Sequence, residues 1–200
     1  MKDKNMEDVI LNAALEVVNK NTISGTRMHL IAQKADMAQS NIHYHYKTKH
    51  NLMVALHKKV VRRYVEIRDE IRDNYGDTLS DQLDIYFQQK LDCILKEPEY
   101  DIVELDFWLQ ARIDPEYHDI MNHAFDFWRS GIGQIIDKYV PDMPKEKREF
   151  LPHMIISMLE GATLQYHVDE NNFDAEAYLG YCKKMILEVI YKLLFFRQFI

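Results

Sequence analysis

Apolar residues recur every three or four positions along almost the whole chain, which is the spacing of one helix face. A first helix is predicted from about Met6 to Lys20, and a second ends near Lys34, with Thr26 as its candidate N-cap. The inward stripes of these two helices are Val9, Ile10, Ala13, Ala14, Val17 and Val18, then Met28, Ile31 and Ala32. No segment alternates as a half-buried strand does, so the predicted fold class is all-α.

Proline, glycine and polar clusters divide the rest of the chain into further helices. A short helix is predicted over 39–46, and a longer one runs from a cap at Thr48 to about residue 74, before Gly76. Five more are expected near 80–96, 99–112, 115–139, 145–168 and 174–196. They are separated by Glu97-Pro98, by Asp114-Pro115 and by two polar loops. The expected total is about nine helices.

Residues 22–52 have the pattern of two short helices joined by a tight turn, followed by the start of a longer helix. Asp36 lies where the chain must turn, and aspartate tolerates a left-handed backbone better than most residues that carry a Cβ. The second short helix and the residues after it carry a dense set of polar, aromatic and basic groups: Gln39, Ser40, Asn41, His43, Tyr44, His45, Lys47 and Lys49. This combination is typical of a helix-turn-helix motif that enters the major groove of DNA.

The distribution of charge agrees with a DNA-binding end, although the net charge of the chain is −7. Up to Val65 there are 11 Lys and Arg against 5 Asp and Glu, which gives +6; the remainder gives 14 against 27, or −13. A basic third beside an acidic remainder implies an anionic partner at one end only.

Composition excludes several other classes of protein. The two cysteines, Cys93 and Cys182, form no Cys-x-x-Cys pair, so we expect no disulfide framework and no thiolate zinc site, and a reducing cytoplasm fits. Neither a signal peptide nor a membrane span is expected, and the apolar end Leu193–Ile200 has no assigned role. The pair His43 and His45 would point about 200° apart on a helix. We therefore expect no metal and no cofactor.

Residues 9–57 resemble the tetracycline-repressor (TetR) family of bacterial one-component regulators. The resemblance rests on ILNAALEVV, on the second-helix pattern beginning with TRMHL, and above all on SNIHYHYKTKHNL. The chain departs from the family pattern at Asp36, where glycine is usual, and at Ala38, where serine or threonine is usual. More weakly, FWLQARIDPEY, Phe127-Trp128 and MLEGATLQY resemble the betaine-regulator branch of the family.

The resemblance implies residues that contact DNA. Gln39, Ser40 and Asn41 would face base edges from the first turn of the recognition helix, where Gln and Asn pair with adenine. Phosphate contacts are implied at Thr26 or Arg27, at His43 and Tyr44, and at Lys47 and Lys49. The alternative is that Ile42, Tyr44 and Tyr46 pack the three-helix core, which we expect for Ile42 and favour for Tyr46.

The resemblance also implies an effector pocket in the acidic part of the chain. The residues on the helices that usually line it are Glu104, Asp106, Phe107, Trp108, Gln110, Trp128, Tyr166 and His167. Aromatic rings beside carboxylates suit a cationic ligand. The alternative that these aromatic residues are simply core remains open.

The last two predicted helices suit a dimer interface, in which two copies would form a four-helix bundle. Candidate residues for this interface are Leu151, Ile155, Met158, Ala162, Tyr178, Cys182, Met185 and Val189. These stripes could instead face their own chain.

These observations predict a cytoplasmic, homodimeric DNA-binding regulator with no enzyme activity. Residues 1–52 would form the helix-turn-helix domain, and residues 53–200 the effector-binding and dimerisation domain. The expected partners are a near-palindromic double-stranded operator and a small-molecule effector that releases the repressor by shifting the fourth helix. The alternatives are an enzyme or carrier built on a helical bundle without specific DNA binding, and a ligand-independent DNA-binding protein that partners another regulator.

Overall fold

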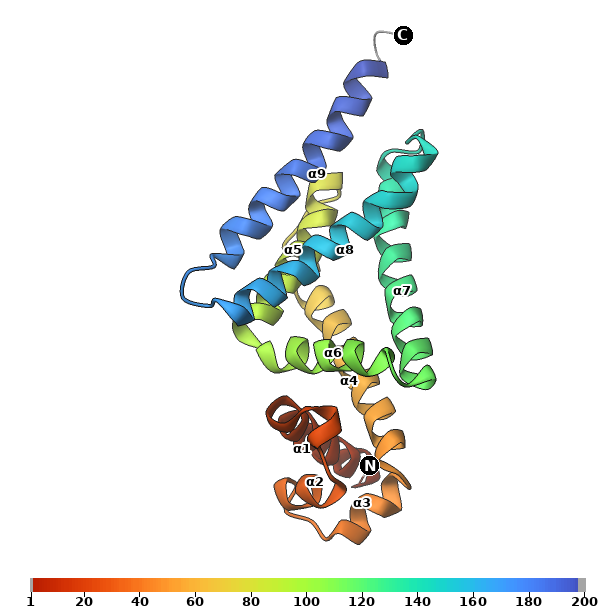
Figure 1. Cartoon of the computed structure of the whole chain (residues 1–200). Coiled ribbons are helices and arrows are strands. Elements are labelled where there is room, and N and C mark those ends of the chain that lie inside the picture. The colour runs from red at the N-terminus through yellow and green to blue at the C-terminus, as the bar shows by residue number, and fades with distance from the viewer. Residues whose placement is uncertain (1, 198–200) are drawn as a thin grey trace. The chain divides into compact units, whose positions relative to one another are not determined.

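The computed structural model describes the backbone of residues 2–197 and the side chains of residues 6–192. Within this range the chain forms nine helices and no strand (Figure 1). They are α1 (Lys2–Gly25), α2 (Met28–Lys34), α3 (Gln39–His45), α4 (Lys49–Arg72), α5 (Leu79–Lys96), α6 (Pro98–Ala111), α7 (Pro115–Tyr139), α8 (Lys145–Val168) and α9 (Ala175–Arg197). The predicted all-α fold class is confirmed. Pro98 and Pro115 begin α6 and α7, where their missing N–H costs no helical hydrogen bond.

The described chain forms two compact units, and the helices α4 and α7 contribute to both. The first contains the residues up to Val65 together with Glu97–Asn122, and the second contains Glu66–Lys96 and the chain from His123 onward. The predicted functional division at residues 1–52 and 53–200 stays a prediction. In the structure, α6 packs within the same unit as α1, α2 and α3.

The first unit is built around the apolar stripe of α1. Ile10 and Ala14 are completely buried, as predicted, whereas Val9 is exposed. Met28, Ile31 and Ala32 of α2 are buried, and so is Ile42, which anchors α3 to the three-helix core. The start of α4 adds Leu52, Met53 and Leu56 to the same core. These contacts fix the short helices α2 and α3, which at seven residues each are too short to be stable alone.

The end of α1 differs from the prediction. The helix is interrupted at Thr22, whose φ of 61° and ψ of 166° lie outside the helical region. Thr26 does not cap α2, because its hydroxyl donates to the carbonyl of Thr22 at 2.7 Å. The residue at the N-cap position is Arg27, which makes no capping hydrogen bond with its side chain. Thr48, by contrast, caps α4 as predicted and accepts the N–H of Asn51 at 3.1 Å.

The second unit is held by the packing of α9 on both α5 and α8. Its buried residues include Leu83 and Phe87 of α5, Ile155 of α8, and Leu179 and Ile186 of α9. An ion pair adds to this packing, because Lys90 of α5 lies 3.0 Å from Glu160 of α8 and is almost completely buried.

Two further expectations concern the chain as a whole. Cys93 and Cys182 are both buried, and neither forms a disulfide within the described residues. No helix within the described residues is long and apolar enough to cross a membrane. The side chains of the apolar end Leu193–Ile200 lie outside the described residues.

Candidate DNA-binding site

The short helix α3 presents its polar residues to solvent and its one apolar residue to the core. Gln39, Ser40 and Asn41 are exposed in its first turn, and Ile42 is fully buried. Because the buried side chain fixes how the helix is turned, the three polar side chains share the free side. This is the arrangement that reading of base edges requires.

The turn before α3 has the backbone that the sequence predicts. Asp36 has a φ of 53°, in the left-handed region where an aspartate is tolerated. Ala38 occupies the N-cap position of α3 without a capping side chain, so the first N–H groups of this helix have no side-chain acceptor. These N–H groups and the exposed polar residues lie at the same end of α3.

The side chains proposed to bind phosphate differ in their exposure. His43, Tyr44 and Lys47 are exposed, with 75% of Tyr44 accessible to solvent, so packing of the core does not account for Tyr44. Tyr46 is half-buried, and burial together with the carboxylates of Glu7 and Asp8 raises its pKa. Of the two alternatives before α2, Thr26 is completely buried and Arg27 is exposed. We therefore assign the proposed phosphate contact to Arg27.

Lys49 begins α4 and lies close to Arg27. Its ammonium group donates a hydrogen bond to the carbonyl of Ile23, next to the interruption of α1. Burial lowers the pKa of Lys49, the charge of Arg27 lowers it further, and the carboxylate of Asp106 opposes both effects. Two cations close together, one at the N-cap of α2 and one at the start of α4, form a favourable place for a phosphate, because its charge would relieve their repulsion.

Helix α6 contacts the end of α1 through polar groups. Asp106, which is almost completely buried, accepts the backbone N–H of Ile23 through its carboxylate. Gln110 donates to the hydroxyl of Ser24 at 3.0 Å. Sequence reasoning placed Asp106 and Gln110 in an effector pocket, because their position on α6 gave no sign of a partner more than 80 residues earlier. In the structure both side chains bind α1, and a role in binding a ligand stays a prediction.

Helix α6 also contacts α4 through a series of polar pairs. Tyr64 donates to Asp101 at 2.8 Å, and Arg63 donates to Glu97 at 2.8 Å. Together with the bonds to α1, these contacts tie α6 to both α1 and α4.

Besides Asp106 and Gln110, three of the predicted effector residues lie on α6 in the first unit. The Glu104 carboxylate is buried, and its Oε2 lies 3.3 Å from Nε2 of His57 in a geometry that makes no hydrogen bond. Phe107 is completely buried, with its ring 4.9 Å from that of His57 and 5.6 Å from that of Tyr117. Trp108 is half-buried. Glu104 and Phe107 therefore share one cluster of aromatic rings and a histidine.

The other three predicted effector residues belong to the second unit. Trp128 is buried on α7 and stacks at a tilt on Phe125. Tyr166 and His167 are half-buried near the end of α8, with their rings 5.8 Å apart. Their role in binding a ligand stays a prediction.

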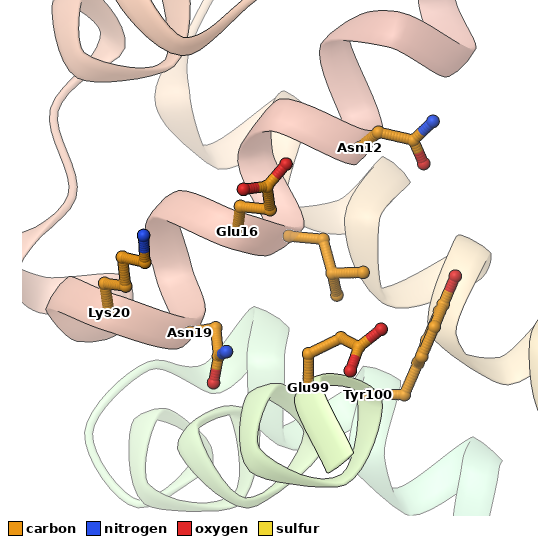
Figure 2. Close-up of a pocket in the computed structure, with 7 residues that line it drawn as sticks. Asn12, Glu16, Asn19, Lys20, Glu99 and Tyr100 are labelled. Carbon is orange, nitrogen blue, oxygen red and sulfur yellow. The ribbon is translucent and has the colours of Figure 1, made fainter. Parts of the chain in front are cut away.

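A groove of about 430 Å³ lies between α1 and α6 in the first unit. Figure 2 shows Glu16, Asn19 and Lys20 of α1 on one side, with Glu99 and Tyr100 of α6 on the other. None of the predicted effector residues lines this groove. Most of its lining residues carry polar or charged side chains, unlike those of typical small-molecule sites.

The residues predicted for a dimer interface divide by their exposure. Four of them are buried within the chain and contribute to its own core: Leu151, Ile155, Ala162 and Cys182. Met158 and Tyr178 are half-buried, and Met185 and Val189 are exposed. The interface residues were predicted from their apolar pattern, which does not distinguish the inward from the outward faces of α8 and α9. Only residues on the outward faces are available to a partner.

A helix-turn-helix with exposed polar residues on its second helix, attached to a helical body, defines a class of DNA-binding transcriptional regulators. Residues 10–56 match the model of the bacterial regulatory proteins of the tetR family. Residues 98–190 match the model of the C-terminal part of BetI-type transcriptional repressors. The chain belongs to the TetR family and has a BetI-like C-terminal part. No curated protein sequence matches the chain.

Solved structures share the fold at low sequence identity. A transcriptional regulator from Rhodococcus sp. Rha1 is 15% identical, with a TM-score of 0.78 over 93% of this chain and 96% of its own. A TetR transcription regulator from Haloarcula marismortui is 16% identical, with a TM-score of 0.74 over 92% and 96%. A regulator from Saccharomonospora viridis, solved in complex with choline, is 16% identical, with a TM-score of 0.79 over 92% and 96%. The family and these neighbours are transcriptional regulators and not enzymes, so the enzyme alternative is set aside.

The bond from Ile23 to Asp106 generates a prediction about stability. We expect Asp106→Ala to lower the free energy of unfolding by about 1–3 kcal/mol, because it leaves the N–H of Ile23 buried without an acceptor. The exposed Asp119 on α7 provides a matched control, and Asp119→Ala should change the free energy by less than about 0.5 kcal/mol. Urea unfolding followed by circular dichroism measures both. Equal stability of the two variants would show that the bond is not needed.

Proposed function

We propose that the protein is a homodimeric repressor that binds a near-palindromic operator and is released by a small-molecule effector in the cytoplasm. The observation that carries the proposal is the anchoring of α3 by Ile42, which leaves Gln39, Ser40 and Asn41 together on its free side. Two such helices in a dimer would enter successive major grooves about 34 Å apart. The basic charge of the first 65 residues supports the same reading.

The roles of base and phosphate contacts can be separated. We expect the wild-type chain to bind its own upstream intergenic duplex more tightly than an unrelated duplex, measured by fluorescence anisotropy across a salt series. Asn41→Ala should cost about 1–3 kcal/mol on the specific duplex and reduce the preference for it. Lys49→Ala should weaken both duplexes alike and reduce the slope of log K against log salt by about one.

The control for these variants is Arg112→Ala, which removes an exposed charge just beyond α6. Its salt slope should equal that of the wild type. The proposal fails if the wild type binds both duplexes equally, and the role of Lys49 fails if Lys49→Ala and Arg112→Ala have the same slope.

Exposed apolar side chains on α8 and α9 support a dimer. On α8 the exposed side is Phe150, Met154, Leu164 and Val168, with the small residues Ser157 and Gly161 between them. On α9 it is Tyr181, Met185 and Val189, spaced four residues apart. We define these seven apolar residues as the α8–α9 stripe. Side chains of this kind at helical spacing on two packed helices are typical of a surface that another helix pair covers.

Substitution within the α8–α9 stripe tests the dimer. We expect the wild type to sediment as a dimer at micromolar concentration, and Leu164→Glu with Met185→Glu to sediment as a monomer, because two-fold symmetry duplicates each buried charge. Ile113→Glu, at an exposed apolar residue after α6, should leave the dimer intact. A wild type that sediments at its monomer mass of 23.9 kDa would contradict the proposal.

The carboxylate of Glu104 supports a cationic effector. It is buried beside Phe107 and His57, and neither of its oxygens accepts a hydrogen bond within the described chain. A cation beside this carboxylate and its aromatic neighbours would be held by charge and by the ring faces. The neighbour from Saccharomonospora viridis holds choline, a quaternary ammonium cation, within the same fold. A ligand there would act on α6, whose bonds reach both α1 and α4.

A panel of amines and quaternary ammonium compounds tests this part of the proposal. We expect at least one to raise the melting temperature of the wild type and to weaken its binding to the operator. Glu104→Gln should abolish both effects, because it removes the charge while keeping the size of the side chain. Glu99→Gln, on the same helix and in the polar groove of Figure 2, serves as the control. The proposal of a cationic effector fails if only apolar or anionic compounds shift the melting temperature.

A further inference from the structure

Arg68 of α4, in the second unit, is a buried cation without a carboxylate partner. Only 8% of the residue is exposed. Its Nη1 donates to the side-chain carbonyl of Gln89 at 3.1 Å, and its guanidinium carbon lies 5.2 Å from the centre of the Tyr86 ring. Within the described residues Arg68 forms no ion pair. The carboxylate of the adjacent residue, Asp69, pairs with Arg72 at 3.0 Å. Arginine is almost never buried to this extent unless it is paired.

The guanidinium lines a hollow of about 300 Å³ that is walled by α4, α5 and α7. The lining contains three cationic side chains, two tyrosines and two glutamines, and no carboxylate. Two of the cations, Arg72 and Lys138, are exposed at the rim and are already paired, with Asp69 at 3.0 Å and Asp77 at 2.7 Å. Arg68 is thus the buried, uncompensated charge of the hollow.

The wall of the hollow depends on a close approach of Tyr86 to the backbone of α7. A Cβ placed on Gly131 would lie 2.6 Å from the Tyr86 hydroxyl, so a larger residue there would displace the tyrosine that covers Arg68. Gly133 lies two positions beyond Gly131 on the same helix, and a Cβ there would meet nothing within 4 Å. Of the two glycines in the Gly131-Ile-Gly133 sequence, only the first is required by this contact.

We propose that this hollow binds a small organic anion whose carboxylate or phosphate group pairs with the guanidinium of Arg68. The planar fork of a guanidinium matches both groups through two parallel N–H···O bonds. The amide groups of Gln82 and Gln134 and the hydroxyl of Tyr86 supply further hydrogen-bond donors at the walls, whereas the Tyr139 hydroxyl already donates to Asp77. A volume of about 300 Å³ is at the lower end for small-molecule sites.

Two features set this site apart from its surroundings. The chain after Val65 carries a net charge of −13, and its negative potential repels anions in general. A cationic hollow within it would bind an anion at this one place. The site shares no residue with those predicted to bind the cationic effector. Burial lowers the pKa of Arg68, and the Tyr86 phenol opposes this shift most strongly. A bound anion would replace the hydration that the guanidinium loses on burial.

Calorimetric titration of the full chain tests the proposal without DNA, so its outcome is independent of the DNA-binding experiments. The probes are inorganic phosphate and benzoate at pH 7.5, with ionic strength held constant by exchange against chloride. We expect saturable binding of at least one probe, and the comparison shows whether the site prefers a phosphate or a carboxylate. Arg68→Gln should weaken binding at least tenfold, because it removes the charge that pairs with the anion. Arg62→Gln removes an exposed charge from the same helix and should bind as the wild type does.

Further variants keep the test decisive if Arg68→Gln does not fold. Gly131→Ala should weaken binding several-fold by displacing Tyr86, and Gly133→Ala should not. The proposal is overturned if the wild type shows no saturable binding of either probe. It is also overturned if folded Arg68→Gln, or failing that Gly131→Ala, binds as tightly as its control.

Discussion

The packing of α1, α4 and α6 in the first unit depends on the backbone N–H and carbonyl of Ile23. Thr22 interrupts α1 with a left-handed backbone. The backbone N–H and C=O groups that follow must therefore form hydrogen bonds outside the regular helix. The N–H of Ile23 donates to Asp106 of α6, and its carbonyl accepts from Lys49 of α4. One residue therefore joins three helices through polar bonds, beside a backbone conformation that residues with a Cβ rarely adopt.

This junction explains why α6 packs with the DNA-reading helices. Apolar contacts resist separation but permit sliding, whereas a buried carboxylate bonded to one N–H fixes a single register. Tyr64 and Arg63 of α4 add bonds to Asp101 of α6 and to Glu97, the N-cap residue of α6. A displacement of α6 would therefore act on both α1 and α4, to which it is bonded. Sequence reasoning predicted a shift of the fourth helix alone.

The helices could be predicted because apolar spacing and proline positions are local signals. The predicted boundaries of 115–139 and 145–168 agree with α7 and α8, and the others lie within a few residues of those observed, apart from the two ends of α1. The local signal misleads at Thr26, which resembles an N-cap but donates its hydroxyl to the carbonyl of Thr22, where α1 is interrupted. Local signals also fail where a partner is distant. Asp106 and Arg68 owe their roles to residues far along the chain. Exposure on α8 and α9 also depends on tertiary packing, so apolar pattern alone could not separate core from interface.

Lys49 connects the junction at Ile23 to the proposed contact with DNA. Its ammonium is already bonded to the Ile23 carbonyl, and burial and Arg27 both lower its pKa, so the charged form is less favourable than in water. A phosphate between Lys49 and Arg27 would stabilise both charges and hold Lys49 where the junction places it. Binding of DNA and integrity of the junction would then favour each other. By linkage, an effector that draws Asp106 from Ile23 must weaken DNA binding by the same free energy with which DNA opposes that effector.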